Sequence, residues 1–373
     1  MIRKRDVSDW TSAFRVLLVY PAFVFCLFAA SAQPTVGQEV SDRQAPTRPG
    51  TRLRPSSVLA PIVREAAPEI SSPAPKVDSQ PVSASGPLGP PVDSWLDAQV
   101  ELARRGFSSG SIDGVAGPKT RAALRAFQAS RNLPTTGELD AITRLQLVLS
   151  ASSLARCTLA VEERAELQPL QPTWLGKSQQ PALAYETMLE AVSDRFHAHP
   201  ALIRRLNPSL NWDAVADDTA LVVPSVERVL LGVKAARLRI RLSDCVLEAC
   251  DEKGNVLAHF PVSIGREAVS RPLGELRVTM LISDPTYTFD PSVFPESAEA
   301  RELGRKLILP AGPNNPVGVA WIGLDRPGYG IHGTPSPERV GRAESHGCFR
   351  LTNWDARTLL DLAWAGMPVS VEP

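Results

Sequence analysis

The sequence predicts a multidomain protein. A mostly-β domain at the carboxyl-terminal end, a β-sandwich with a short C-terminal helix, follows a small three-helix domain and a small α+β module. The 373 residues suffice for two or three domains. The 34 prolines are spread unevenly and recur about every five residues between positions 33 and 91. After residue 228 apolar residues alternate with polar ones, as in half-buried strands, whereas residues 92–226 show mainly helical spacing.

Charge and composition exclude several classes of partner. Lysine and arginine number 40, as do aspartate and glutamate, so the formal net charge is zero. A chain without a basic excess gives no electrostatic argument for nucleic acid or anionic lipid as a partner. No Cys-x-x-Cys pair or zinc-ligand spacing of histidines occurs, so we expect no metal and no other cofactor.

Residues 1–32 are interpreted as a signal peptide. Basic residues at positions 3–5 precede an apolar run from 16 to 32 that closes on the small residues Ala30-Ser-Ala32. Cleavage there is favoured over an uncleaved anchor, because Pro21 interrupts a run that is barely long enough to cross a bilayer. We therefore expect export to the periplasm or cell envelope, with membrane contact only if the signal stays uncleaved.

Residues 33–91 are interpreted as a disordered, Pro-rich linker. The segment has no aromatic residue, and its composition cannot bury enough apolar surface to offset the entropy of ordering. It is expected to be locally extended. Such a segment serves either as a tether that lets the folded part reach through a porous layer or as a spacer with no specific purpose.

Four cysteines follow the signal peptide, and in an oxidising compartment they could form two disulfides. That arrangement would consume Cys348, so at most one bridge is expected among Cys157, Cys245 and Cys250. Cys245 and Cys250 lie an odd number of residues apart in a predicted strand, which puts their side chains on opposite faces. No pairing is assigned.

Residues 92–150 are predicted to form the three-helix domain. The first helix ends near Gly106 and the second begins at Pro118. The third is expected to carry the apolar residues Ile142, Leu145 and Leu147. The domain resembles the three-helix peptidoglycan-binding domain in Gln99, Ile112-Asp-Gly-Val-Ala-Gly117, Thr120, Ala123-Leu124, Phe127-Gln128 and Thr136-Gly137. An ordinary helical bundle with no ligand is the alternative.

Residues 151–182 are interpreted as a connector with a charged helix, and residues 183–226 as a small α+β module. The order helix, helix, strand in this module resembles the LysM fold, a βααβ unit that holds glycan. Its first strand is poorly marked, and Asp217-Asp-Thr stands where a glycine turn is expected. His197 and His199 straddle a helix end and are expected to be solvated.

Residues 228–373 are predicted to form the mostly-β domain. Strands are expected at 238–242, 256–264, 275–282 and 368–371, with a hairpin turn at 251–255 and a helix at about 353–365. Thr352 or Asn353 is expected to cap that helix. His259 falls on the polar phase of its strand and is therefore left out of the candidate site.

The segment from Gly330 to Asn353 carries the strongest chemical signal, with two of the five histidines and one of the five cysteines. A cysteine becomes a strong nucleophile where a nearby imidazole favours its thiolate. His332 ends an apolar run that is predicted to be a strand, and Gly347 frees the backbone beside Cys348. An inert buried cysteine is the alternative, which this clustering disfavours.

The string Gly330-Ile-His-Gly-Thr-Pro followed by Ser345-His-Gly-Cys-Phe-Arg350 resembles the active site of L,D-transpeptidases with a YkuD-type catalytic domain. The resemblance covers roughly residues 229–371 and includes Asn315-Pro-Val-Gly and Pro272-Leu-Gly-Glu. Arg271 departs from the threonine that the family usually has before this Pro-x-Gly turn.

The resemblance implies acyl transfer between peptides of the bacterial wall. Cys348 would attack the carbonyl of the third residue of a stem tetrapeptide, release D-alanine and pass the acyl group to an amine. His332 would be base and acid, oriented by the carbonyl of Gly333, and a thiolate is expected at position 348. Backbone N–H groups of Gly347 and Cys348, helped by His346, would bind the oxyanion.

Four further residues are expected to bind substrate. Arg350 lies two residues after Cys348, so an extended backbone places both side chains on one face, beside the reacting carbonyl. A salt bridge to Asp355 is its alternative role. Ser345 is expected to hold the loop. Trp321 and Tyr329 are expected to line the cleft, with a place in the core as the alternative.

The sequence leaves other functions open. A cysteine endopeptidase of the NlpC/P60 kind is disfavoured, because those enzymes place cysteine before histidine in the chain. A non-catalytic wall-binding scaffold is a further alternative. The expected partners are peptidoglycan stem peptides and glycan, with a carbapenem as covalent inhibitor at Cys348. The acyl acceptor is another stem peptide, a lipoprotein lysine or water.

Overall fold

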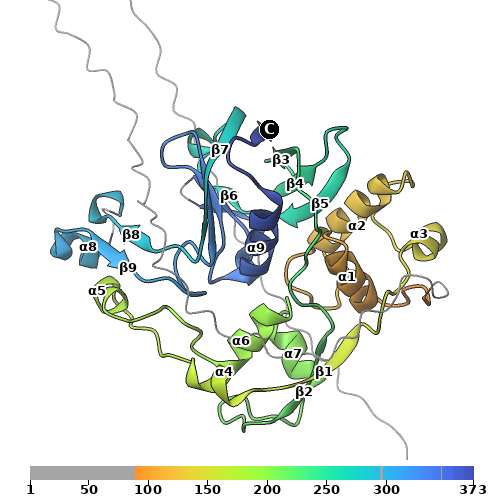
Figure 1. Ribbon diagram of the computed structural model, residues 1–373, viewed down its shortest axis with the longest axis horizontal. Helices are drawn as coiled ribbons and strands as arrows, with labels where there is room; N and C mark the ends of the chain where they lie inside the picture. Colours follow the sequence, from red (N-terminus) through yellow and green to blue (C-terminus); the bar gives the residue numbers. More distant parts are fainter. Residues whose placement is uncertain (1–88, 295–296, 346) are drawn as a thin grey trace, which may run out of the picture. The chain divides into compact units, whose positions relative to one another are not determined.

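The computed structural model describes residues 89–294, 297–345 and 347–373 (Figure 1). The expected signal peptide and nearly all of the expected linker fall on residues 1–88, outside the described residues. All the described residues belong to one compact unit. Within this part of the chain, no helix is long and apolar enough to cross a membrane.

The amino-terminal domain contains α1 (Trp95–Arg104), α2 (Pro118–Ser130) and α3 (Ala141–Gln146). Ser94 and Asp97 form a capping box at the start of α1, so two backbone N–H groups that a helix leaves unpaired are satisfied. Because proline has no N–H, its place at the first position of α2 costs no hydrogen bond.

One apolar cluster holds these helices together, and it includes Ala98, Leu102, Ala123, Leu124, Phe127 and Leu147. Ile142 and Leu145 were expected to contribute, yet they are 54% and 72% exposed. Helix α3 is too short to bury a whole apolar face, and its contact with the domain is made by Thr143 and by Leu147 just after it.

The loop between α1 and α2 is organised by the buried side chain of Gln99. Its Nε2 donates to Asp113 Oδ1 at 2.8 Å and to Thr120 Oγ1 at 2.9 Å, and its Oε1 accepts from Gly114 N at 2.7 Å. Gly114 has φ of 78°, a conformation that favours glycine. The loop residues of this domain thus satisfy a buried amide.

The second module begins and ends with paired strands, β1 (Leu154–Thr158) and β2 (Ala220–Pro224), which run antiparallel. Between them lie α4 (Val161–Ala165), α5 (Trp174–Ser178), α6 (Met188–Arg195) and α7 (Pro200–Leu206). The first strand therefore lies inside the segment interpreted as a connector. Asp218 has φ of 57°, so an aspartate takes the left-handed conformation for which a glycine was expected.

His197 is buried, so the expectation that it is solvated is wrong. Its ring stacks on Trp354, with centroids 5.2 Å apart and an interplanar angle of 9°. The cause is that the second module packs against the carboxyl-terminal helix of the β domain. His199 is half-buried, and its Nδ1 accepts a hydrogen bond from Ala201 N at the start of α7.

The β domain is built on one eight-stranded sheet with the order β13-β11-β10-β7-β14-β3-β4-β5. Its strands are β3 (Arg237–Arg241), β4 (Val246–Cys250), β5 (Val256–Pro261), β7 (Gly274–Ser283), β10 (Ala320–Leu324), β11 (Gly330–His332), β13 (Phe349–Arg350) and β14 (Pro368–Glu372). The first part of β7 pairs with β14 and the rest pairs with β10. A β-sandwich was expected to have two separate layers. Here the strands form one continuous sheet, because β7 pairs with strands of both halves.

Both halves of the sheet contribute to one core cluster, which includes Leu238, Ile240, Phe260, Ile322, Ile331 and Phe349. Helix α9 (Asn353–Leu362) packs into it through Ala356, Leu359 and Leu362. Thr352 caps this helix, since its Oγ1 accepts from Asp355 N at 3.2 Å.

Shorter elements complete the β domain. Strand β6 (Ile264–Gly265) pairs with β12 (Ala343–Ser345), and β8 (Tyr287–Phe289) pairs with β9 (Leu307–Leu309). The remaining elements are α8 (Ala298–Leu303), η1 (Ala268–Ser270), η2 (Pro291–Val293) and η3 (Pro337–Arg339). A second apolar cluster, which we call the β8–β9 cluster, includes Leu183, Tyr287, Phe289, Leu309, Val317 and Trp321.

The helical domain covers the edge strand β5 (Figure 1). Ser108 N donates to His259 O at 2.8 Å, and His259 N donates to Gly106 O at 2.9 Å. The Oγ of Ser108 also donates to Asp355 Oδ2 at 2.9 Å. A sheet edge that would otherwise be unpaired is therefore protected, and His259 is only 1% exposed.

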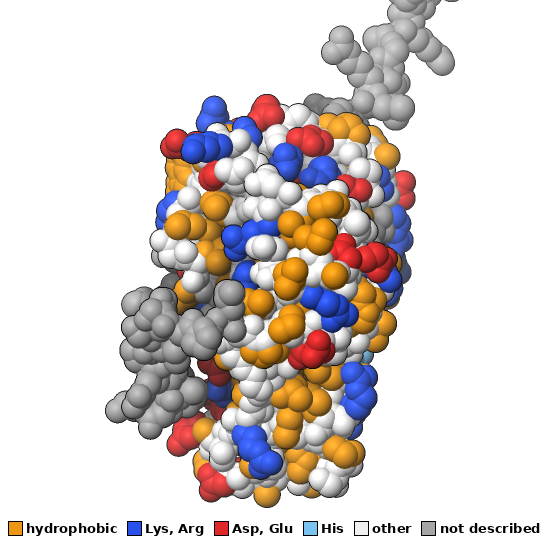
Figure 2. All heavy atoms as spheres, turned by 90° about the vertical axis from the view of Figure 1, so that its right-hand side faces the viewer, with side chains coloured by type: hydrophobic (Ala, Val, Ile, Leu, Met, Phe, Trp, Pro, Cys, Tyr) orange, Lys and Arg blue, Asp and Glu red, His pale blue; other side chains and the backbone are white. Residues whose placement is uncertain are grey.

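Charges of both signs are interspersed with hydrophobic side chains on the face that Figure 2 presents, which is the right-hand side of Figure 1. This pattern agrees with the zero net charge of the sequence. It gives no single-sign surface on that face for a polyanion or an anionic membrane.

Candidate active site

Two short parallel strands bring the cysteine and the histidine to one face of the sheet. In the register of β11 and β13, Ile331 is opposite Phe349 and His332 is opposite Arg350. Cys348 immediately precedes β13 and therefore lies opposite Gly330. Since side chains alternate along a strand, Cys348, Arg350 and His332 share one face, and Ile331 and Phe349 point into the core on the other.

Cys348 is a half-buried thiol that is not part of a disulfide. Its Sγ donates a hydrogen bond to Gly328 O at 3.4 Å, and it packs against the β8–β9 cluster. Cys157, Cys245 and Cys250 are free as well, so no disulfide consumes the sulfur at position 348.

Burial raises the pKa of the Cys348 thiol, while the N–H of Gly330 and the charge of Arg350 act in the opposite direction without cancelling it. The apolar cluster around the sulfur thus acts against the thiolate expected at this position, and that expectation remains a prediction.

His332 is buried, 4% exposed, and held in one tautomer. Its Nδ1 lies 2.6 Å from Gly333 O, and because a carbonyl only accepts, Nδ1 carries the proton. Nε2 is left with a free lone pair for a proton. Burial, followed by the charge of Arg350, lowers the pKa of His332 to about 3, although the bond to Gly333 opposes this shift.

Trp321 lies behind the imidazole. Its ring and that of His332 have centroids 5.6 Å apart and an interplanar angle of 21°. This approach depends on Gly330, because a Cβ at that position would lie 2.5 Å from the indole. Trp321 is 4% exposed, so it supports His332 from the core side more than it lines an open cleft.

Tyr329 does not line the site, contrary to the expectation from the sequence. It belongs to the core cluster of Ile331 and Phe349, on the opposite face of the sheet from Cys348. The guanidinium of Arg326 lies over its ring, 4.6 Å from the centroid. Tyr329 lies two positions before Ile331, with Gly330 between them, and alternation along the strand gives both side chains the same orientation.

Arg350 is half-buried and lines a cavity of about 160 Å³. The other lining residues are Ser263, Pro316, Thr334, Pro335, Ser336, Arg339 and Val340. Its backbone exchanges two hydrogen bonds with Ser263, at 2.8 and 2.9 Å, which fix the strand on which the side chain stands. The register of β11 and β13 places this cation opposite His332, although neither His332 nor Cys348 is among the residues that line the cavity.

The loop before the cysteine is described only in part. Gly347 is buried and has φ of 152°, a backbone conformation that other residues seldom adopt. Ser345 ends β12, and its side chain is not among those described. His346 lies outside the described residues. The oxyanion role expected of His346 and the loop-holding role of Ser345 remain predictions.

Three residues that support the site were not expected from the sequence to do so. Gly328 and Gly330 contact the sulfur through their backbones, and only their glycine spacing around Tyr329 hinted at this. Asn353 is buried at the start of α9, and its Oδ1 would obstruct a Cβ on either Gly318 or Gly333. The carbonyl that orients His332 is therefore packed against the helix.

The described residues contain no group of three or more His, Cys, Asp or Glu that could hold a metal ion. The arrangement instead combines a thiol, a base with a fixed tautomer and a nearby cation. These groups are suited to nucleophilic attack on a carbonyl followed by acyl transfer.

Two family models match this chain. Residues 235–371 match the L,D-transpeptidase catalytic domain, and residues 92–147 match the family described as "Putative peptidoglycan binding domain". The first match contains every candidate residue at the site, and the second spans the three helices of the amino-terminal domain.

The chain is also similar to proteins named as L,D-transpeptidases. The chain is 23% identical over 192 residues to "Putative L,D-transpeptidase YkuD" of Bacillus licheniformis, across 50% of this chain and 93% of that protein. It is 30% identical over 152 residues to "Probable L,D-transpeptidase ErfK/SrfK" of Escherichia coli, across 40% and 46%. A crystal structure of an L,D-transpeptidase from Xylanimonas cellulosilytica aligns with TM-score 0.32 and 16% identity, across 79% of this chain and 100% of that one.

Proposed function

The chain carries an L,D-transpeptidase catalytic domain at residues 235–371, and from this premise we propose that it forms 3-3 cross-links between peptidoglycan stem peptides. The donor is a stem tetrapeptide, and the acceptor is the side-chain amine of a second stem. Cys348 is the nucleophile and His332 the general base and acid.

The observation that carries this proposal is the placement of the thiol and the imidazole on one face of β11 and β13, with Nδ1 of His332 fixed to Gly333 O. A histidine base must present the lone pair of one ring nitrogen while its other nitrogen is held. In His332 the carbonyl of Gly333 holds Nδ1. A histidine that was buried near a cysteine by chance would not need a hydrogen bond that fixes its tautomer.

The first step starts from the neutral pair. Sγ of Cys348 forms a bond to the carbonyl carbon of the third residue, and its proton passes to Nε2 of His332. The carbonyl oxygen becomes an oxyanion, for which the N–H groups of Gly347 and Cys348 are the candidate donors. Because burial disfavours the imidazolium, the proton leaves Nε2 readily for the departing amine, and D-alanine is expelled.

The second step reverses the first. The acceptor amine attacks the thioester carbonyl, His332 takes a proton from the amine, and the C–S bond breaks to regenerate the thiol. Arg350, on the same face and beside a cavity of about 160 Å³, is suited to bind a carboxylate of the donor through its planar guanidinium.

The test is to incubate the full chain with tetrapeptide muropeptides and weigh the products. Cross-linking yields dimers that have lost one D-alanine. Cys348→Ala should abolish them, and the matched variant Cys157→Ala, which removes a half-buried thiol in β1, should leave the yield unchanged. Tripeptide monomers alone would indicate a carboxypeptidase, attachment to a lipoprotein lysine would indicate a different acceptor, and no product would favour a non-catalytic scaffold.

A carbapenem should acylate Cys348, because its strained carbonyl presents the same electrophile to the same thiol. The expected mass increase should be absent from Cys348→Ala and present in Cys157→Ala. Acylation without cross-linking would mean that Cys348 is a competent nucleophile but that the acyl group is not passed to a stem-peptide amine.

The helical domain and the LysM-like module are proposed to hold the enzyme on glycan or stem peptides, and the signal at residues 1–32 to export it to the periplasm or cell envelope. Sedimentation with purified sacculi tests the first proposal, and fractionation of cells tests the second. Recovery in the cytosolic fraction would contradict export.

A further inference from the structure

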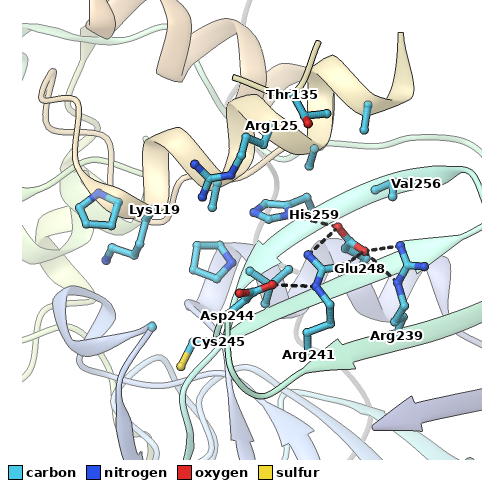
Figure 3. A pocket seen from close by; sticks show the side chains of 17 residues that line it. Lys119, Arg125, Thr135, Arg239, Arg241, Asp244, Cys245, Glu248, Val256 and His259 are labelled. Atoms are coloured by element: carbon cyan, nitrogen blue, oxygen red, sulfur yellow. Dashed lines mark hydrogen bonds and ion pairs between the residues drawn. The ribbon is translucent and has the colours of Figure 1, made fainter. Parts of the chain in front are cut away.

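A second cavity, of about 480 Å³, lies between helix α2 of the helical domain and strands β3, β4 and β5 of the catalytic domain (Figure 3). Its size is typical of sites that bind small molecules or peptide ends. Small residues on α2 leave this space open: Ala122, Ala126 and Ala129 line it. The opposite face of the helix supplies Ala123, Leu124 and Phe127 to the domain core.

Helix α2 presents two cations to this cavity, Lys119 and Arg125 (Figure 3). Among the described residues, Lys119 donates one hydrogen bond, to Val340 O at 3.1 Å, and forms no ion pair. Arg125 is exposed and has neither a hydrogen bond nor an ion pair within the described part of the chain. Burial lowers the pKa of the half-buried Lys119, so an anion beside it would relieve a desolvated charge.

The sheet side of the cavity is also basic. Arg239 and Arg241 both donate to the buried Glu248, each at 2.7 Å, and Arg241 also donates to Asp244 at 2.9 Å. Nδ1 of His259 faces Glu248 across 3.8 Å, and its Nε2 has no hydrogen-bond partner among the described residues. Four cationic and two anionic side chains thus line the cavity, which leaves two positive charges in excess.

The cavity is a built feature of the protein, because its two walls are fixed to each other. The backbone bonds of His259 to Gly106 and Ser108 join the helical domain to β5, and Lys119 reaches the catalytic domain at Val340. Gly341 is part of the wall. Neither domain alone could form this site.

The same segment separates this cavity from the one that holds Arg350. Val340 and Arg339 line the Arg350 cavity, and Gly341 lines the α2 cavity. The N–H of Gly341 donates to Ser263 Oγ at 3.1 Å, and Ser263 is paired with Arg350. An extended peptide that crosses residues 340–341 would connect the two.

We propose that the cavity between α2 and β3–β5 binds a carboxylate-bearing peptide end of the wall polymer, through Lys119 and Arg125. This inference rests on the proposed function and adds a second contact for the substrate, away from the reacting carbonyl. Arginine and lysine bind carboxylates by charge-assisted hydrogen bonds, and the polymer's peptides supply such groups, whereas its uncharged sugars do not.

The experiment uses the full chain acylated at Cys348 by a carbapenem, so that the donor groove is filled and the remaining binding reports the second cavity. Calorimetry measures binding of a stem tetrapeptide, of the same peptide with every carboxylate amidated, and of inorganic phosphate. We expect the free acid to bind and the amidated peptide to bind about tenfold more weakly, the loss typical of a charge-assisted hydrogen bond. Arg125→Gln and Lys119→Gln should each weaken binding of the free-acid peptide by a similar factor.

Controls separate this site from the catalytic one. Arg125→Lys should retain most of the binding, and Lys253→Gln, in the exposed β4–β5 turn, should retain all of it. The rate of carbapenem acylation should be the same in Arg125→Gln as in the unmodified chain. Equal binding of the free acid by Arg125→Gln would overturn the proposal, as would displacement of the peptide by equimolar phosphate. Failure of acylation itself would instead refute the proposed function.

Discussion

At the scale of the residue, burial acts on both members of the proposed catalytic pair, Cys348 and His332. Burial shifts the two pKa values in opposite directions, the thiol upward and the imidazole down to about 3. Burial thus disfavours an ion pair between the two groups, and in the proposed reaction the proton moves as the C–S bond forms.

The pH dependence of acylation follows from this. His332 is neutral above its pKa of about 3, so the rate of acylation by a carbapenem should be constant from about pH 5 to pH 8. An imidazole with an ordinary pKa near 6.5 would instead give an acid limb in that range. Stopped-flow acylation at constant ionic strength measures this, with circular dichroism to establish that the fold persists at pH 5. A fall in rate centred near pH 6.5 would contradict the neutral pair.

The shared face of the candidate residues was predictable from the sequence, whereas their burial was not, and their catalytic roles remain predictions. The order His332, Gly347, Cys348, Arg350 is a local pattern, and strand alternation gives the shared face. Cys348 is buried against a cluster that includes Leu183, a residue far away in sequence, so this burial could not be predicted from the local pattern. Tyr329 was expected to line the cleft, but it lies two positions before the buried Ile331. Alternation along the strand therefore directs both side chains into the core.

At the scale of the element, the strands of the catalytic domain were readable because their apolar residues recur with period two. Strand β1 was missed for the opposite reason: its residues alternate poorly, and it is stabilised by pairing with β2, more than sixty positions later. The contribution of α3 was overestimated, since apolar spacing alone does not say whether a partner surface exists for Ile142.

Strand β11 offers a test at this scale through Gly330. An added Cβ would lie 2.5 Å from the Trp321 ring, so Gly330→Ala should displace the indole and with it His332. We expect a loss of about 1–3 kcal/mol in unfolding free energy, the usual result of overpacking, together with slower acylation of Cys348. Denaturant unfolding and acylation rates measure the two effects.

The matched variant is Gly117→Ala, where an added Cβ meets nothing within 4 Å and φ is −79°. It should alter stability far less and leave acylation unchanged. If Gly330→Ala reacted at the normal rate, Trp321 would have no part in positioning the imidazole.

At the scale of the whole molecule, the three folded parts meet around the amino-terminal end of α9. Ser108 of the helical domain donates to Asp355, and His197 of the second module stacks on Trp354. These contacts could not be predicted, because each joins residues that show no shared pattern in the sequence. Beside this junction, the backbone bonds of His259 to Gly106 and Ser108 hold the helical domain against β5, where the second cavity lies.

Asp355 makes this junction sensitive to pH. Burial raises the pKa of its carboxyl to about 7, although Thr352, Ser108 and Lys119 act against the shift. A carboxyl whose pKa is raised on folding stabilises the protein fully below its unfolded value near 4, and that stabilisation is lost as pH rises to the folded value. The native protein should therefore be less stable at pH 8 than at pH 5, by an amount on the order of 2–4 kcal/mol for this group.

Asp355→Asn should remove this dependence, because the amide stays uncharged and its oxygen still accepts from Ser108. At pH 8 the variant should melt at a higher temperature than the native protein, whereas at pH 5 the two should be nearly equal. The control Asp213→Asn, an exposed carboxylate, should follow the native curve at both pH values. Calorimetric melting of all three proteins measures this. An Asp355→Asn variant that melts lower at pH 8 would mean that the ionised carboxylate stabilises the junction, and the three parts would then be joined by charge.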